Sequence, residues 1–120
     1  MVRAGPGLGR AVSRAPSRGE VYLVDLDPTR GREMQKTRPC LVVSPDEVNH
    51  HLRTVIVAPM TTGGQPYPWR VPCRFKQKAG RVALDQLRTV DRERLVQRIG
   101  VLGGETVAAV LATLGEMFSA

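Results

Sequence analysis

The chain has 120 residues, 42% of them hydrophobic and 24% charged, which fits one soluble domain that buries its own core. No apolar run approaches the ~20 residues that a membrane span needs, and the arginines near the N-terminus are not followed by the apolar stretch of a secretory signal. We therefore expect a cytoplasmic protein. The formal charge of +7 and the pI of about 10.4 are typical of nucleic-acid binding without proving it.

The predicted elements begin after a low-complexity start. Residues 1–17 are rich in Gly, Pro, Ser, Ala and Arg and lack periodicity, so we expect a disordered basic arm there and a folded domain over 18–120. Runs of β-branched and apolar residues predict about six short strands, at 20–26, 39–44, 54–58, 69–74, 82–87 and 95–102. Turn residues occupy 27–31 and 78–80, and short helical turns are expected at 46–52 and 91–94.

The spacing of the apolar residues changes after Gly103-Gly104. Apolar residues then recur at helical spacing, at Val107, Val110, Leu111, Leu114, Met117 and Phe118. The sequence therefore predicts an α+β, mainly β fold. We expect a small SH3-like barrel or strongly curved antiparallel sheet, with a C-terminal amphipathic helix packed on it.

A polar loop before the second strand offers the first candidate site residue, Arg38. Proline restricts the residue before it to extended conformations, so Pro39 holds the Arg38 backbone. A forked, always-charged donor on a fixed backbone suits a phosphate group. The alternative is that Arg38 is an ordinary surface arginine.

Two further segments place polar side chains in apolar surroundings. Thr61 lies where the third strand opens into a Gly-rich loop, and its hydroxyl is placed to bond a phosphate oxygen or simply to cap the turn. Asp85 and Arg88 interrupt an apolar stretch, where a structural ion pair is the alternative to a functional role. Between Glu47 and Asp85 there are six basic residues and no acidic one, at Arg53, Arg70, Arg74, Lys76, Lys78 and Arg81.

The potential metal ligands are few. Cys40 and Cys73 are 33 residues apart and belong to no CxxC pair, so we expect two reduced thiols in apolar surroundings. His50 and His51 are adjacent and make no metal site alone. We therefore predict no metal and no cofactor, and leave acid–base work by these histidines as an alternative.

Read together, these segments resemble the MazF/PemK family of toxin–antitoxin ribonucleases. The similarity runs in order from Arg18 to about Phe118. The matching runs are Arg18–Tyr22, Asp25–Gly31, Arg38–Ser44, Val57–Thr62, Tyr67–Trp69 and Asp85–Asp91. The resemblance implies a homodimer with an SH3-like barrel that cleaves single-stranded RNA sequence-specifically without a metal. It also implies silencing by a cognate, MazE-like antitoxin, with DNA contacted only through that antitoxin.

The resemblance also implies site residues. Arg38 corresponds to the catalytic arginine and Thr61 to the catalytic Thr or Ser, while Glu33 and Asp85 match carboxylates implicated in different members. We further expect RNA contacts from Arg30, Arg32, Lys36, Thr62, Trp69, Arg70, Gln86 and Arg88. Tyr67 and Phe75 are additional aromatic platforms, and the alternative for Trp69 is a place in the core or in the dimer interface. The basic stretch 70–81 would attract the RNA backbone or an acidic antitoxin tail.

The chain departs from the family pattern in places. Arg32 stands where many members have Ser or His, Met34 where many have Gln, and Ala83 where some have an arginine. The role of that arginine is therefore vacant or moved. The arm before Arg18 has no family counterpart that we can place.

The chemistry implied by the resemblance needs little from the protein. RNA supplies its own nucleophile, the 2′-OH, and cleavage would leave a 2′,3′-cyclic phosphate and a 5′-OH. Arg38 and Thr61 would stabilise charge on the phosphate, and either Glu33 or Asp85 would accept the proton.

Two other functions remain open at this point. One is a gyrase poison of the same fold, although the ending Phe118-Ser119-Ala120 lacks the tryptophan of such toxins. The other is an RNA-binding barrel that cuts nothing.

Overall fold

The computed structural model describes residues 14–120. Most of the predicted basic arm, residues 1–13, lies outside the described residues. The described chain contains the strands β1 (Glu20–Asp25), β2 (Thr37–Val42), β3 (Thr54–Thr61), β4 (Arg70–Phe75), β5 (Lys78–Ala83), β6 (Arg88–Asp91) and β7 (Leu95–Val101), and the helices α1 (Asp46–His51) and α2 (Gly104–Met117). Two 3₁₀ turns, Leu84–Gln86 and Arg92–Arg94, flank β6.

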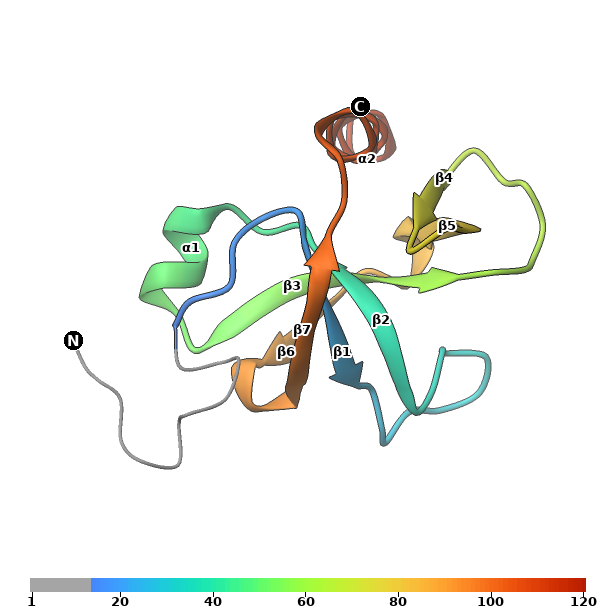
Figure 1. Ribbon diagram of the computed structural model, residues 1–120. Coiled ribbons are helices and arrows are strands. Elements are labelled where there is room, and N and C mark those ends of the chain that lie inside the picture. The colour runs from blue at the N-terminus through green and yellow to red at the C-terminus, as the bar shows by residue number, and fades with distance from the viewer. Residues whose placement is uncertain (1–13) are drawn as a thin grey trace.

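The strands form one curled antiparallel sheet with α2 across it (Figure 1), as the sequence predicted. The order is β4-β5-β3-β2-β1-β7, and β6 pairs with β3 off this path. Strand β3 organises the sheet because its eight residues pair with β2 along their middle, with β6 at their start and with β5 at their end. The Arg38 end of β2 and the last residues of β3 therefore reach the same end of the sheet.

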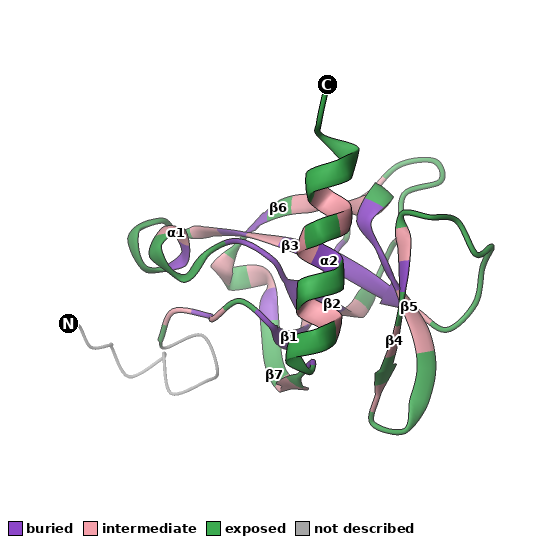
Figure 2. Cartoon of the chain, turned by 90° about the horizontal axis from the view of Figure 1, so that it is seen from above, coloured by how far each residue is buried: buried purple, intermediate pink, exposed green. Residues whose placement is uncertain are grey.

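Both faces of the central strands are buried, as the purple segments of Figure 2 show. Leu41 belongs to the cluster beneath α2, whereas its neighbours Cys40 and Val42 belong to the cluster on the other face. This follows from the two-residue period of a strand and explains why these strands are nearly all apolar. Cys40 and Cys73 are free thiols, as predicted, and burial raises the pKa of Cys40 to about 12.

Helix α2 buries the inner part of its predicted apolar face. Val110 is fully buried, and Val107 and Leu114 pack against the same cluster. Met117 and Phe118, predicted to continue that face, are exposed in this single chain, Phe118 to 75%. The helices described in residues 14–120 are too short or too polar to cross a membrane.

The turn predicted at 78–80 and the strand predicted at 82–87 are wrong. The chain turns at Lys76 and Gln77, which both have positive φ, and β5 already occupies 78–83 in a hairpin with β4. The sequence concealed this turn because two-residue hairpins with positive φ usually carry Asn or Gly. The short strand β6 was not predicted, because Val90 is the one buried residue among its four.

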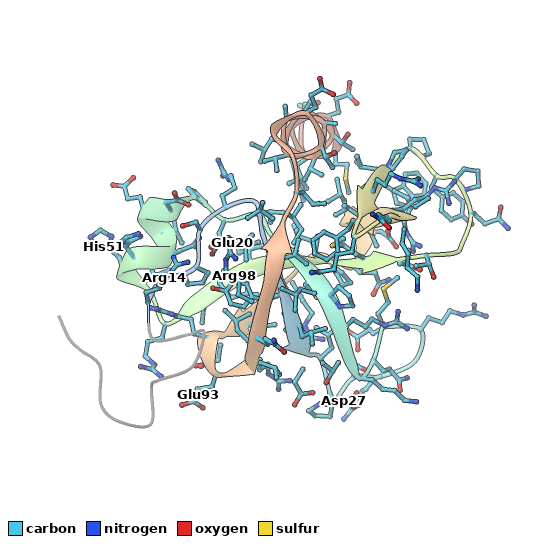
Figure 3. All side chains as sticks on the ribbon, in the orientation of Figure 1. Arg14, Glu20, Asp27, His51, Glu93 and Arg98 are labelled. Carbon is cyan, nitrogen blue, oxygen red and sulfur yellow. The ribbon has the colours of Figure 1, made fainter. Side chains whose placement is uncertain are left out.

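The described end of the predicted arm is fastened to the domain. Glu20 is only 5% exposed, and its carboxylate accepts hydrogen bonds from Ser17 N at 2.7 Å and from Arg98 Nε at 2.6 Å. Arg14 bonds the same carboxylate at 3.2 Å, and these side chains converge beside β7 in Figure 3. Asn49, fully buried, donates to Pro16 O at 3.0 Å. The chain is therefore anchored from Arg14 onwards, and the boundary at residue 18 stays a prediction.

Candidate active site

The register of β2 and β3 brings the two principal candidates together. Cys40 pairs with Pro59, and continuing this antiparallel register by two residues places Arg38 opposite Thr61. Both residues line one open cavity of about 410 Å³. The cavity is also lined by Lys36 and Lys78, and no carboxylate is among its lining residues. It is therefore a cation-rich cavity, and we refer to it below as the first cavity.

Arg38 is half-buried and is held by its strand. Its backbone pairs with Val24 of β1, and its Nε donates to Gln35 O at 3.2 Å. The loop before it is fixed by two bonds at Lys36, whose N–H donates to Asp27 Oδ1 at 2.8 Å and whose carbonyl accepts from Leu26 N at 2.9 Å. The guanidinium is thus presented from a defined backbone, as Pro39 led us to expect.

Thr61 fulfils the turn-capping alternative and also lines the cavity. Its Oγ1 accepts a hydrogen bond from Gly63 N at 3.2 Å, which shapes the start of the Gly-rich loop. Gly80 of β5 packs against its backbone so closely that an added Cβ would lie 2.6 Å from Thr61 O. The hydroxyl is therefore held from its own loop, and the backbone that carries it packs against β5.

The remaining carboxylates and their neighbours line a different cavity. This second cavity, of about 300 Å³, is lined by Leu26, Glu33, Met34, Pro59, Asp85, Gln86, Leu87 and Arg88. The two cavities are neighbours, because Pro59 of the second and Thr61 of the first lie two residues apart and therefore on the same face of β3, and Met34 and Gln35 are consecutive in the β1–β2 loop. The structure thus brings Arg38 and Thr61 together in the first cavity and places Glu33 and Asp85 in the second.

Asp85 is held in a bidentate ion pair by Arg70. The Nε and NH2 atoms of Arg70 lie 2.5 and 2.8 Å from Oδ1 and Oδ2 of Asp85. These hydrogen bonds lower the pKa of Asp85 and raise that of Arg70, although partial burial opposes both shifts. Asp85 does form a structural ion pair, but its partner is Arg70 and not Arg88, which donates to Leu26 O at 3.2 Å.

The other expected site residues divide by location. Lys36 and Thr62 line the first cavity, and Gln86 and Arg88 line the second. Arg30 and Arg32 are exposed on the β1–β2 loop and line neither. Glu33 in the same loop accepts a hydrogen bond from Arg30 N at 2.7 Å.

Trp69 stacks on Tyr67 at the edge of the β3–β4 loop. Their ring centroids are 5.0 Å apart, the ring planes differ by 13°, and the rings are 37% and 44% exposed. The pair precedes Arg70, whose N–H donates to Tyr67 O at 2.9 Å. Two flat, partly exposed rings beside the second cavity's ion pair form a surface on which a nucleic-acid base can stack.

Sequence reasoning missed part of the first cavity. Lys78 and Gly80 line it from β5, and Gln35 lines it from the loop. The run of basic residues was the available signal for Lys78, but only the hairpin turn at Lys76 and Gln77 brings that lysine to Arg38.

The histidines lie away from both cavities. His50 and His51 are exposed on α1, on the opposite side of the molecule from the β4–β5 hairpin (Figure 3), and the ring Nδ1 of His51 lies 2.8 Å from Glu47 O. Among residues 14–120, no three His, Cys, Asp or Glu side chains gather closely enough to hold a metal ion.

The protein is thus a small curled β-sheet with one C-terminal helix, and a cation-rich cavity lies at one end of the sheet. These features can be compared with those of known protein families. The sequence model of one protein family, the PemK-like, MazF-like toxins of type II toxin–antitoxin systems, matches residues 17–118. The chain belongs to this family.

Individual members of the family are also similar to the chain in sequence. The chain is 36% identical over 91 residues to the endoribonuclease MazF of Staphylococcus epidermidis, covering 71% of this chain and 76% of that protein. It is 53% identical over 47 residues to the endoribonuclease PemK of Escherichia coli, covering 39% of this chain and only 35% of PemK.

Solved structures share the fold. A MazF crystal structure from Deinococcus radiodurans superposes with a TM-score of 0.76 at 27% identity, over 86% of this chain and 96% of that chain. An endoribonuclease from a mycobacterial species, in complex with its cognate antitoxin, superposes with a TM-score of 0.72 at 26% identity, over 85% and 93%.

Proposed function

We propose that the first cavity is where this endoribonuclease of the PemK/MazF toxin family cleaves single-stranded RNA. The observation that carries the proposal is the placement of Arg38 opposite Thr61 in a cavity with two lysines and no lining carboxylate. A phosphate there meets a forked donor, a hydroxyl and two further cations. A type II toxin acting in this way would cut mRNA at short sequences and so stop translation and growth.

The reaction needs no metal, because RNA carries its own nucleophile. The 2′-oxygen attacks the adjacent phosphorus and loses its proton, the bond from phosphorus to the 5′-oxygen breaks, and that oxygen takes up a proton. The products are a 2′,3′-cyclic phosphate and a 5′-OH. Arg38 and Thr61 stabilise the charge that develops on the phosphate oxygens, and each such donor is often worth ~10²–10³ in rate.

Glu33 is the better proposal for the proton acceptor. Both oxygens of Asp85 are engaged by Arg70, and the lowered pKa makes Asp85 a weaker base. Glu33 is exposed in the loop that leads into the first cavity through Gln35. The proton for the leaving oxygen is not assigned to Arg38, because a guanidinium pKa above ~12 makes it a poor acid.

RNA binding is proposed to extend from the first cavity along its neighbours. Lys36, Thr62 and Lys78 contact the phosphates next to the scissile one. Trp69 and Tyr67 stack a base, Gln86 and Arg88 bond base edges, and Arg30 and Arg32 attract the backbone from the exposed loop.

The partners are proposed from the family and from the surface. A mycobacterial relative has been solved with its cognate antitoxin, and we expect a MazE-like antitoxin with an acidic tail to cover the basic cavity. DNA would be contacted only through it. We expect a cytoplasmic homodimer that covers exposed apolar residues such as Phe118 and Val101.

The test is cleavage of a long RNA by the purified protein in EDTA, followed by mapping of the ends. Cuts that leave 2′,3′-cyclic phosphate and 5′-OH ends are expected, and they should disappear in Arg38→Ala and Thr61→Ala. Wild-type cutting by both folded variants would overturn the site, and loss of all cutting in EDTA would overturn the metal-free reaction. RNA that shifts on a gel yet stays intact would indicate a binding barrel instead.

A further inference from the structure

The two cavities differ in the chemistry of their linings. The first presents Lys36, Arg38 and Lys78, whereas the second presents the carboxylates of Asp85 and Glu33. The one cation of the second cavity, Arg88, already donates to a backbone carbonyl. Its volume of about 300 Å³ is within the ~300–1,000 Å³ of small-ligand pockets. An anion suits the first cavity, and a neutral group with N–H donors suits the second.

Asp85 is fixed as a hydrogen-bond acceptor. Arg70 holds its two oxygens at 2.5 and 2.8 Å, and the Arg70 side chain is itself only 14% exposed, so the pair is rigid. Arg70 also lowers the pKa of Asp85, which keeps the carboxylate ionised at neutral pH. An ionised carboxylate accepts and does not donate, and Oδ1 keeps a second lone pair beyond its bond to Arg70, whereas Oδ2 also accepts from Gln86.

Gln86 stands beside this acceptor with its amide oriented by two contacts. Its Oε1 accepts from Met34 N at 3.3 Å, and its Nε2 lies 3.4 Å from Asp85 Oδ2. The other N–H of Nε2 is therefore a donor close to the acceptor that Asp85 offers. A neighbouring donor and acceptor match the edge of a nucleic-acid base.

We propose that Asp85 reads one base of the RNA by accepting a hydrogen bond from its exocyclic amino group. This inference rests on the proposed cleavage function. Adenine, cytosine and guanine carry such an amine, whereas uracil carries none, and its single donor on that edge, N3–H, is flanked by two carbonyl oxygens that an ionised carboxylate repels. Arg70 is the positioning residue that aims Asp85, and because the cavities are neighbours the base that Asp85 reads lies close to the cut.

Cleavage of a randomised RNA library by the wild-type protein tests the base preference directly. Sequencing of the cut ends should show one position near the cut where uracil is depleted on the order of 10-fold. Oligonucleotides that replace the amine of the preferred base by hydrogen (purine for adenine, inosine for guanine) should be cut more slowly by a similar factor. Equal cutting of uracil at every position, or equal cutting of the analogues, overturns the proposal.

Two variants then assign the preference to its residues. Asp85→Asn adds an amide donor and should accept uracil at that position, and Arg70→Lys should weaken the preference in the same direction. Glu47→Gln, a carboxylate removed from the exposed helix α1, is the matched control and should keep the library profile.

The outcomes separate the two proposals. No cutting by the wild-type protein overturns the cleavage function itself. Loss of cutting by Asp85→Asn of ~10²–10⁴ on all sequences alike makes Asp85 the proton acceptor and overturns base reading. If Asp85→Asn does not fold, the analogue experiment with the wild-type protein decides.

Discussion

Gly80 lies so close to Thr61 that the two backbones leave no room for a side chain between them. A Cβ at position 80 would meet Thr61 O at 2.6 Å and the Cα of Thr62 at 3.8 Å. Gly80 therefore lets β5 close over the end of β3 and holds the backbone of the proposed catalytic threonine.

Gly80→Ala should displace Thr61 and slow cleavage. The contact is with backbone, which cannot rotate away, so we expect a loss of about 1–3 kcal/mol in unfolding free energy. Gly63→Ala is the matched control, because a Cβ there meets no atom within 4 Å. Urea unfolding and single-turnover cleavage of both variants measure the two effects. Wild-type cleavage and stability in Gly80→Ala would show that the strands separate easily.

Arg38 should differ from other arginines in its effect on rate. Arg38→Lys keeps the charge but loses the fork, so we expect cleavage to fall at least 10-fold, and Arg38→Ala should cost ~10²–10³. Arg53→Ala is the control, since the Arg53 side chain forms a salt bridge with exposed Glu93, away from both cavities. Equal rates in the three variants would remove Arg38 from the site.

The contribution of Lys78 to phosphate binding should be measurable in the salt dependence of RNA affinity. Each phosphate contact on single-stranded RNA contributes about 0.7 to the slope of log affinity against log salt. Lys78→Ala should reduce the slope by that amount, measured by fluorescence anisotropy with an uncleavable 2′-deoxy substrate. An unchanged slope would place Lys78 outside the phosphate path.

Glu20 should make stability depend on pH. Burial opposes its ionisation, but hydrogen bonds from Ser17, Arg98 and Arg14 outweigh burial and lower its pKa below the ordinary 4.5. A lowered folded-state pKa stabilises the fold above the unfolded-state value, and that stabilisation is lost as pH falls through the folded-state pKa. Glu20→Gln should therefore be less stable than wild type at pH 7, with the difference shrinking below pH ~4.5.

Urea midpoints at pH 7 and pH 3.5 measure this difference. Glu116→Gln, on the exposed end of α2, is the matched control. A gap between Glu20→Gln and wild type that stays constant with pH would mean that Glu20 acts by packing rather than by charge.

The sequence predicted the fold where the signal was local. Continuous runs of β-branched and apolar residues located β1 and β3, and the helical period located α2. The β4–β5 turn escaped because Lys76 and Gln77 adopt a conformation that their residue types rarely take.

The candidate site was predictable in part for the same reason. Arg38 was marked by the proline beside it, and the family resemblance supplied Thr61. The link between Arg70 and Asp85 joins residues on different elements, so only the packing of β4 against the 3₁₀ turn reveals it. That packing also separates Asp85 from the first cavity, which no reading of spacing could show.

The pairing of β1 with β7 has a consequence for how the protein is made. Glu20 lies opposite Val101, so β1 gains its second neighbour only after nearly the whole chain exists. Closing so long a loop costs entropy before contacts repay it, which slows folding. The curled sheet is therefore completed at this seam only after the other strands have been made, and any activity that depends on the finished sheet waits for that step.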